Sequence, residues 1–393
     1  MNSIKILPKK VTKLLNVKLI RALSDLELHA AAWDNLVASL PEQMPFSSHA
    51  WIATFLQYRL SPERQWCCML AYEGSELVGV LPLIITPCRV CGFPSHQLQN
   101  PKGAHTRSVG LVAAPGKEAE VVESFLSSLD RVDPKWCSVY FEQIPASSPL
   151  IQNLDHGVHG MQSFHEFNNM GAYLPTIGNF DDFRSSLKKS FRTNLTTATN
   201  RLNRYKNFNY EFLEGEKANP ADLERFMKVE VINWKGQAGS AIIQSSDLIE
   251  FYSQLANRLA RRGWLEWHFL MTEGKTIAGN LAMRCCRTLF IWKLGYDEDY
   301  AKCSPGTLLF EQVIKRAFES NEIDKIDLIS DPLWARNWHM QRREFHNLWI
   351  YPKRMMPFVV HILPKKIKNR LRQIPMLRKT AQRARNLFKK TDS

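Results

Sequence analysis

The same order of expected secondary structure occurs twice along the chain, and this repetition constrains the fold more than any other feature. In the first half, apolar residues at helical spacing predict two helices over 26–60, and alternating segments predict a strand–turn–strand unit over 66–85. Strands at 109–113 and 136–143 follow, separated by a helix at 117–129. This series predicts an α/β unit.

The second half has a similar series, although the residues themselves are not repeated. In order, the sequence predicts helices at 183–204, 220–235 and 246–262, strands at 266–272, 277–284 and 288–296, a helix at 305–319 and a strand at 325–329. Because only the order of elements is shared, we interpret it as a weak internal duplication. A chain of 393 residues suits two such domains.

Basic residues are concentrated at the two ends of the chain. The formal charge is +14, from 52 Lys and Arg against 38 Asp and Glu. Residues 1–24 hold six cations and no acid, and residues 351–393 hold thirteen cations and one acid, which leaves a net charge of −4 on residues 25–350. A nucleic-acid-binding domain needs a basic folded surface, so this distribution argues against DNA and disfavours tRNA as partners.

Both basic ends mix cations with apolar residues at helical spacing, which is typical of amphipathic segments that lie on anionic membranes. These segments are 4–20 at the N-terminus and 365–390 at the C-terminus, the latter preceded by an apolar stretch at 355–363. The alternatives are solvated tails, or tails that dock on the acidic body. The expected division is a basic N-terminal segment at 1–24, domains at 25–170 and 171–352, and a basic helical tail at 353–393.

The sequence predicts a cytoplasmic protein, with the basic ends favouring the inner face of a membrane. No apolar run reaches the roughly 20 residues of a spanning helix, and no apolar segment of a signal peptide follows the N-terminal cations. The eight cysteines are scattered, as in a reduced protein. Cys88 and Cys91 have the spacing of half a zinc site, but His96 and His105 supply no second tight pair, so we expect no metal.

The most specific chemical signal lies between the strand at 288–296 and the following helix. Ser304 can cap that helix, Pro305 suits its first turn, and Gly306 lets a ligand approach the backbone. A helix N-terminus has unpaired N–H groups and a partial positive charge, and Lys302 adds a cation. Such a turn suits a pyrophosphate, and the alternative is an ordinary helix start.

Several short segments of the second half resemble the acetyltransferase domain of the CelD family. They are Trp234-Lys235, Glu273–Gly279, Trp292-Lys293, Tyr296-Asp297, Ser304–Leu309 and Asp327–Asp331. The first half fits through Trp33, Pro45–Ser47, Trp51 and Glu76–Leu83. CelD-like proteins occur around cellulose and exopolysaccharide biosynthesis and resemble the Fem-type transferases. The resemblance implies an α/β (α+β) fold of two tandem GNAT-like domains, each a mixed sheet flanked by helices.

Two local patterns differ from those of the related enzymes. Ordinary GNAT enzymes bind the CoA pyrophosphate with a Q/R-x-x-G-x-G/A loop, and Lys302–Thr307 occupies the equivalent place here. CelD-like proteins tend to have a Tyr-Lys pair after the acid of the last strand. Here the segment from Asp331 to Arg336 shifts or lacks the basic residue.

The resemblance implies acyl transfer from acetyl-CoA or another acyl-CoA to a small-molecule or saccharide acceptor. Its implied donor-binding residues are Lys302, Ser304, Pro305, Gly306 and Thr307 for the phosphates, and Phe290, Ile291, Trp292 and Lys293 for the pantetheine arm. The candidate general bases are, in order of preference, Asp331, Asp297 and His339. Tyr296 could protonate the leaving thiolate. For each acid the alternative is a solvated loop residue or a helix cap.

The expected function is an acyl-CoA-dependent N- or O-acyltransferase in polysaccharide or cell-envelope biosynthesis. One alternative is a Fem-type aminoacyl transferase that uses charged tRNA, because the helix at 183–204 has a basic face that could guide an anion. Its cations are Arg184, Lys188, Lys189, Arg192, Arg201 and Arg204, although such a face is usually only solvated. The other alternative is a non-catalytic scaffold of an exopolysaccharide assembly.

Overall fold

The computed structural model describes residues 15–42, 44–90, 92–154, 161–205, 207–232, 236 and 239–352. The expectations for the basic C-terminal tail, for residues 1–14, and for Cys91, Trp234 and Lys235 lie outside these residues. None of the described helices is long and apolar enough to cross a membrane.

The first half of the chain begins with a strand and a helical pair, continues with a hairpin, and then alternates strands and helices. Its elements are β1 (Asn16–Ile20), α1 (Leu23–Glu27), α2 (Ala30–Ser39), η1 (Pro45–Ser47), α3 (His49–Tyr58), β2 (Gln65–Glu73), β3 (Glu76–Val90), β4 (Phe93–Gln99), β5 (Val112–Ala113), α4 (Glu118–Ser127), α5 (Leu129–Val132), β6 (Trp136–Pro145), α6 (Pro149–Leu154) and β7 (Gln162–Pro175). Ser48 caps α3, as its side chain accepts a hydrogen bond from the Trp51 N–H.

The second half follows the same plan. Its elements are α7 (Phe180–Ser186), α8 (Lys189–Leu202), β8 (Asn209–Glu214), η3 (Gly215–Lys217), α9 (Asp222–Ile232), η4 (Ile242–Gln244), α11 (Ser246–Arg261), β9 (Leu265–Thr272), β10 (Lys275–Cys285), β11 (Thr288–Tyr296), η5 (Glu298–Cys303), α12 (Pro305–Glu319), β12 (Lys325–Asp327), η6 (Leu333–Trp338) and β13 (Gln341–Tyr351). The predicted helix at 305–319 agrees with α12 at both ends.

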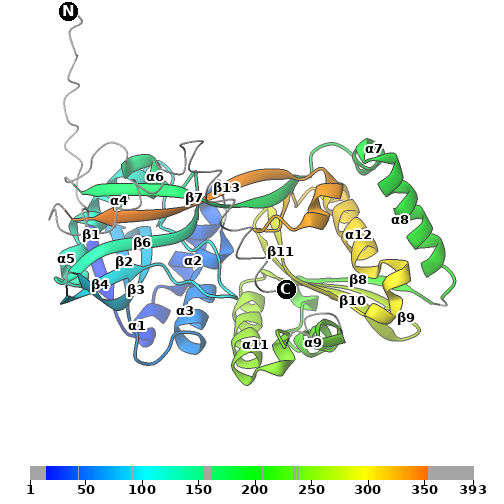
Figure 1. Ribbon diagram of the computed structural model, residues 1–393, viewed down its shortest axis with the longest axis horizontal. Helices are drawn as coiled ribbons and strands as arrows, with labels where there is room; N and C mark the ends of the chain where they lie inside the picture. The colour runs from blue at the N-terminus through cyan, green and yellow to red at the C-terminus, as the bar shows by residue number, and fades with distance from the viewer. Residues whose placement is uncertain are drawn as a thin grey trace, which may run out of the picture.

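One continuous sheet runs through both halves (Figure 1). Its strand order is β1-β2-β3-β4-β6-β13-β7-β12-β11-β10-β9-β8, with β5 beside β3. From either edge, four antiparallel strands are followed by one that pairs in parallel: β4 with β6 in one half and β11 with β12 in the other. This mirrored order confirms the prediction of two α/β units, each with a mixed sheet flanked by helices.

The two halves exchange their last strands at the centre of this sheet. β7 closes the first half in sequence, but it pairs with β12 of the second half through Tyr173–Pro175. β13 closes the second half, but it pairs with β6 of the first half through Phe345–Ile350. β7 and β13 also pair with each other over their lengths. The expected domain boundary at 170–171 therefore falls inside β7.

Two expectations about local structure are wrong. The helix predicted at 183–204 is interrupted, because Leu187 and Lys188 have extended backbones (ψ 153° and 134°) and divide it into α7 and α8. The break turns the Leu187 side chain into the core, where it is 2% exposed. The amphipathic segment at 4–20 ends in a strand, because Asn16–Ile20 pairs with β2 and buries Val17.

The core has three large apolar clusters: one is shared widely by the halves, and each of the others lies mainly in one half and includes residues of the exchanged strand, β13 or β7. The shared cluster joins α2 and α3 to α9, α11 and one face of the β9–β11 part of the sheet. Figure 1 shows α3 beside α11. The second cluster lies under α4 in the first half, and the third lies under α8 and α12 in the second half. The side of β11 that faces the first half is therefore packed into this shared core.

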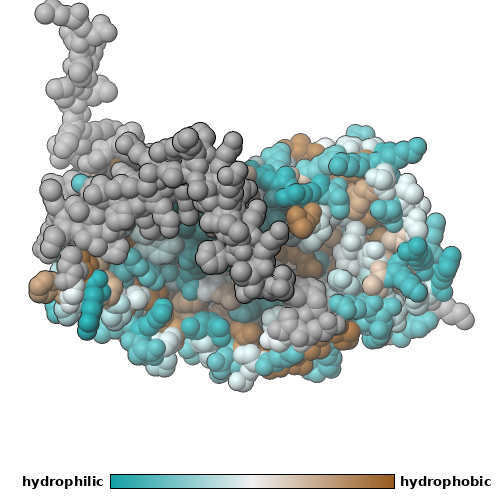
Figure 2. Space-filling view, viewed as in Figure 1, coloured by the Kyte–Doolittle hydropathy of each residue, from teal (hydrophilic) through white to brown (hydrophobic). Residues whose placement is uncertain are grey.

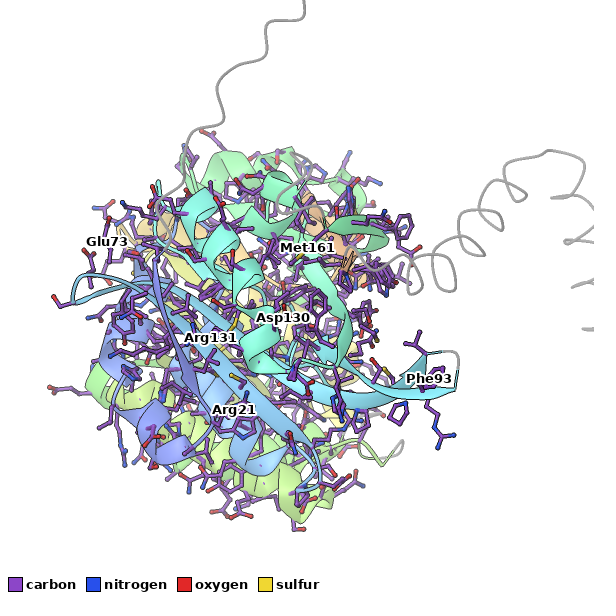
Figure 3. The ribbon with its side chains drawn as sticks, turned by 90° about the vertical axis from the view of Figure 1, so that its left-hand side faces the viewer. Arg21, Glu73, Phe93, Asp130, Arg131 and Met161 are labelled. Carbon is purple, nitrogen blue, oxygen red and sulfur yellow. The ribbon has the colours of Figure 1, made fainter. Side chains whose placement is uncertain are left out.

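The hairpin of β3 and β4 projects from the first half, with Phe93 at its tip (Figure 3). Near its base, the Sγ atoms of Cys88 and Cys137 lie 3.4 Å apart, and both cysteines are free thiols. Among the described residues, no group of three or more His, Cys, Asp or Glu side chains is arranged to hold a metal ion.

Asp34 is a buried carboxyl at the contact of α2 with α3. It is 2% exposed and accepts a hydrogen bond from the His49 backbone N–H at 2.8 Å. Burial raises its pKa to about 6, against an ordinary value near 3.8, although Arg262 nearby opposes the rise. The folded state thus binds a proton more readily than the unfolded chain between pH 6 and pH 4, so this carboxyl favours folding more as the pH falls.

We expect Asp34→Asn to remove this pH dependence. Between pH 7 and pH 5 the unfolding free energy of the wild type should rise relative to the variant by about 1 kcal/mol. Urea denaturation of both proteins at several pH values measures the difference. His49, whose pKa burial lowers to about 4, acts in the opposite direction in both proteins, so it does not obscure the comparison. Parallel pH profiles would contradict the prediction.

Candidate active site

The two parallel strands of the second half separate after a short pairing. β11 pairs with β12 only from Thr288 to Phe290. Beyond that point the chain after β12 bonds to β7 instead, with the Leu328 N–H donating to the Ala172 carbonyl at 2.9 Å. The pairing with β12 thus stops before Ile291. Of the segment predicted for the pantetheine arm, Phe290 is paired with Asp327 and fully buried, and only Ile291, Trp292 and Lys293 lie beyond the pairing. A flexible acyl carrier needs such a wedge between strands to reach backbone hydrogen-bonding groups.

A β-bulge lies on β11 at the start of this wedge. Leu281 pairs with Lys293 and Ala282 pairs with Ile291, so Trp292 is the extra residue of the bulged strand. A bulge bends its strand and redirects side chains, and bulges are common beside active sites. It is at this position that β11 turns away from β12.

The helix after the wedge begins at the protein surface. Ser304 has a left-handed backbone (φ 47°) and is exposed, and its carbonyl accepts bonds from the Thr307 and Leu308 N–H groups at 3.0 and 3.1 Å. Gly306 follows the Pro at the first position of α12, where N–H groups have no intrahelical acceptor. Pro305 has no N–H, and the Thr307 and Leu308 N–H groups bond to the Ser304 carbonyl, so the Gly306 N–H and the positive end of a 15-residue helix are what this turn offers to an anion.

Cations surround this helix start. Arg201 of α8 donates to the Lys302 carbonyl at 2.8 Å, which joins the basic helix to the loop before α12. Lys302 and Arg204 are exposed, and neither forms an ion pair with another described residue. Hydrophilic side chains cover the part of the surface formed by α7 and α8 (Figure 2). The electrostatics favour a polyanionic group such as a diphosphate at the start of α12.

The equivalent place in the first half is occupied by protein groups. β4 pairs with β6 up to its last residue, Gln99. Asn100 then continues the pairing, because its Nδ2 donates to the Glu142 carbonyl and its Oδ1 accepts from the Glu142 N–H, both at 3.0 Å. The corresponding helix, α4, begins with Glu118 and Glu120, which oppose an anion. The wedge suited to an acyl carrier therefore lies in the second half.

The structure separates the predicted acids from one another. Asp331 follows β12 on the far side of the wedge, where its Oδ2 accepts from Arg342 Nε at 2.9 Å and its Oδ1 has no hydrogen-bond partner among the described residues. Asp297 is fully buried, caps η5 through the Asp299 N–H, and pairs with Lys275 Nζ at 2.6 Å. Asp297 thus has structural partners, whereas the Oδ1 atom of Asp331 is buried without a hydrogen-bond partner among the described residues.

Neither Tyr296 nor His339 is part of the bulge, and the two residues lie in different parts of the second half. Tyr296 ends β11, and a Cβ atom built on Gly306 would lie 3.4 Å from Tyr296 Cδ1, so the ring packs on the start of α12. It is therefore close to the helix start at which the sequence predicts the phosphates. His339 is exposed at the turn between η6 and β13, with a left-handed backbone (φ 50°).

A polar cluster beside the bulge was not expected from the sequence. The Tyr252 hydroxyl lies 3.1 Å from Trp292 Nε1 and 3.0 Å from His105 Nδ1. Lys293 Nζ pairs with the buried Glu230 at 3.0 Å and lies over the Tyr252 ring at 5.1 Å from its centroid. Burial raises the pKa of Tyr252 well above its ordinary value, so its hydroxyl stays protonated at neutral pH.

This cluster combines both halves of the chain. His105 comes from the loop after β4, whereas the other members come from α9, α11 and β11. The Phe46 and Trp51 rings pack against the Trp292 ring, with centroid distances of 4.6 and 5.4 Å. No spacing along the sequence marks residues that meet only across the shared core, and Trp292-Lys293 was the one signal available.

The second half matches a known family. Residues 189–357 match the family described as the acetyltransferase (GNAT) domain. This segment begins at α8 and contains the wedge, the bulge and the start of α12. The second half is a GNAT acetyltransferase domain, and the chain is an acyltransferase. No curated protein matches the sequence.

Solved structures share the fold of the whole chain. The crystal structure of FemX resembles it with a TM-score of 0.59 at 12% identity, covering 88% of this chain and 99% of FemX. The C-terminal domain of a proposed lysylphosphatidylglycerol synthetase from Agrobacterium fabrum has a TM-score of 0.51 at 11% identity, covering 86% of this chain and 95% of that domain. At these identities the likeness concerns the fold alone, and it extends over both halves.

Proposed function

We propose that the chain transfers an acyl group from acyl-CoA, with acetyl-CoA as the simplest donor, to an amine or hydroxyl of a small-molecule or saccharide acceptor. The observation that supports this most directly is the wedge between β11 and β12, followed by an exposed helix start among cations. We assign the diphosphate to the first turn of α12 and to Lys302, and the pantetheine arm to Ile291–Lys293.

The residues of the wedge suit the two proton transfers of this reaction. The acceptor attacks the thioester carbonyl, and we assign Asp331 to take its proton, because one of its carboxylate oxygens has no partner among the described residues. The C–S bond then breaks and the thiolate takes a proton. Tyr252 is the better donor for this second step, since it contacts the bulge residue Trp292, whereas Tyr296 lies at the phosphate end.

The resemblance to CelD-like proteins supports a place for this reaction in polysaccharide or cell-envelope biosynthesis, on the cytoplasmic side of a membrane. The basic face of α8 also supports a second candidate, an aminoacyl transferase that takes its donor from charged tRNA, because Lys188, Lys189 and Arg204 are exposed near α12. A tRNA and a CoA diphosphate would both use that positive surface, so binding experiments must separate them.

Isothermal titration calorimetry with acetyl-CoA, free CoA and an aminoacyl-tRNA tests the proposal. We expect acetyl-CoA and CoA to bind with dissociation constants in the micromolar range, about −8 kcal/mol, and to compete with each other. Binding of the aminoacyl-tRNA, without binding of either CoA species, would favour the second candidate. Binding of none of the three would contradict both enzymes and leave a scaffold.

A further inference from the structure

A second recess lies in the first half, away from the wedge. Its volume is about 510 Å³, which is within the range of small-molecule sites. It is bounded by the end of α3 and by the ends of β4 and β6, and its polar lining includes Arg59, Arg64, Gln99, Lys102, Tyr140 and Glu142. No step of the proposed reaction has used these residues.

The charges of this cavity favour an anion. Three cations and two acids line it, and of the cations Arg59 and Arg64 form no ion pair with a described residue, although the exposed Glu63 lies beside Arg64. Lys102 pairs with Glu142, and both burial and the nearby Arg107 lower the pKa of Lys102. Because residues 25–350 have a net charge of −4, a recess with two uncommitted guanidinium groups differs from the rest of the body. Guanidinium groups bind phosphate and carboxylate through paired hydrogen bonds.

The neutral part of the lining suits a hydroxyl-rich body. Gln99, Glu142 and the Tyr140 hydroxyl can each exchange hydrogen bonds with ligand hydroxyls. The Tyr140 ring is held in place by stacking on Trp349, with centroids 4.8 Å apart. Phe55 gives the recess an apolar side. A sugar with an anionic group offers a charge for the arginines and hydroxyl groups for the other polar side chains.

The cavity adjoins the polar cluster beside the bulge. Gly103 lines the cavity, and His105, two residues later, contacts the Tyr252 hydroxyl. That hydroxyl also contacts Trp292 on β11. Arg59 is close enough to Tyr252 for its charge to act on the pKa of that hydroxyl. A ligand held by Arg59 would therefore lie near Tyr252, whose buried side chain contacts β11.

We propose that this cavity binds the acceptor of the acyl transfer, and that the acceptor is an anionic saccharide whose phosphate or carboxylate is held by Arg59 and Arg64. The role of this saccharide as acceptor rests on the proposed function. Its binding in the cavity does not depend on that function. The two halves then bind different substrates. The second binds the donor in its wedge, and the first binds the acceptor where its own wedge is filled.

Titration of the full chain with glucose 6-phosphate, glucuronate and glucose tests the proposal. We expect one or both anions to bind and glucose to bind at least tenfold more weakly, and the better anion distinguishes phosphate from carboxylate. Arg59→Gln and Arg64→Gln should each weaken anion binding about tenfold or more, since each removes charge-assisted hydrogen bonds. Arg89→Gln, at an exposed residue of β3 outside the cavity, is the matched control.

Two results would overturn the proposal: anions that bind no better than glucose, or anion binding that neither arginine variant weakens. If Arg59→Gln fails to fold, the exposed Arg64 decides the question by itself. Acetyl-CoA titrations of the same proteins separate the two proposals. Anion binding without CoA binding would support the proposed cavity and contradict the proposed donor site. CoA binding without anion binding would support the donor site and contradict the cavity.

Discussion

Replacing Gly306 by tryptophan is expected to weaken acetyl-CoA binding about 100-fold, a loss of about 3 kcal/mol. Gly306 lies at the second position of α12, half-exposed, where the diphosphate would approach the backbone. A large side chain there would cover the Gly306 N–H and fill the space beside the helix start, and so remove hydrogen bonds to charged phosphate oxygens, each worth about 1.5–3 kcal/mol. Calorimetry of the wild type and the variant measures the change.

Gly306→Ala is the matched control for this substitution. A Cβ atom at this position would meet its nearest neighbour, Tyr296 Cδ1, at 3.4 Å, which is an ordinary contact. The alanine variant should therefore bind acetyl-CoA within a few-fold of the wild type. Both variants should keep the denaturation midpoint of the wild type, because the position is at the surface. Equal affinities for the tryptophan variant and the wild type would place the diphosphate elsewhere.

Glu266→Gln is expected to lower the unfolding free energy by about 3–5 kcal/mol. Glu266 is 1% exposed on β9; its Oε2 accepts from Arg316 Nη1 at 3.0 Å, and its Oε1 forms an ion pair with Arg284 Nε at 2.9 Å. It also contacts the fully buried His268 at 3.1 Å. Although burial alone would raise the pKa of Glu266, His268 and Arg316 together hold it below its ordinary value. The neutral amide would leave two largely buried guanidinium groups without their buried anion, with only the more exposed Glu214 still shared between them.

Glu322 offers a control that touches the same arginine. Its carboxylate also pairs with Arg284, but its side chain is 70% exposed. Glu322→Gln should change the unfolding free energy by less than about 1 kcal/mol, because water replaces an exposed partner. Urea denaturation of the three proteins at pH 7 compares them. Similar losses of unfolding free energy for both variants would contradict the prediction that the buried carboxylate contributes more stability than the exposed one.

The sequence predicted the repeated architecture because hydrophobic periodicity is strong in its central elements. α11, α12 and the β9–β10 hairpin have regular apolar faces and clear caps or turns, and they lie close to their predicted bounds. β7, β8 and β13 were missed, because few of their residues are buried on one side and the alternation is weak. β1 was hidden among the cations of the N-terminal segment.

The sequence predicted the start of α12, where we propose that the donor binds, but not the polar cluster beside the bulge. Ser304-Pro305-Gly306 is a local signal, since capping and proline preference act within one turn of a helix. Tyr252, His105 and Glu230 meet at the bulge only because the shared core brings α11, the loop after β4 and α9 together. No local rule relates residues that are 147 positions apart, as His105 and Tyr252 are.

The exchange of β7 and β13 determines when each half can finish folding during synthesis. The ribosome releases the first half long before residue 351, yet β6 receives its neighbour only when β13, the last strand, has emerged. Until then the nascent chain carries an open strand edge that must be kept from other chains. Cutting the gene between the two domains would likewise give two fragments, each lacking the strand that the other one contributes.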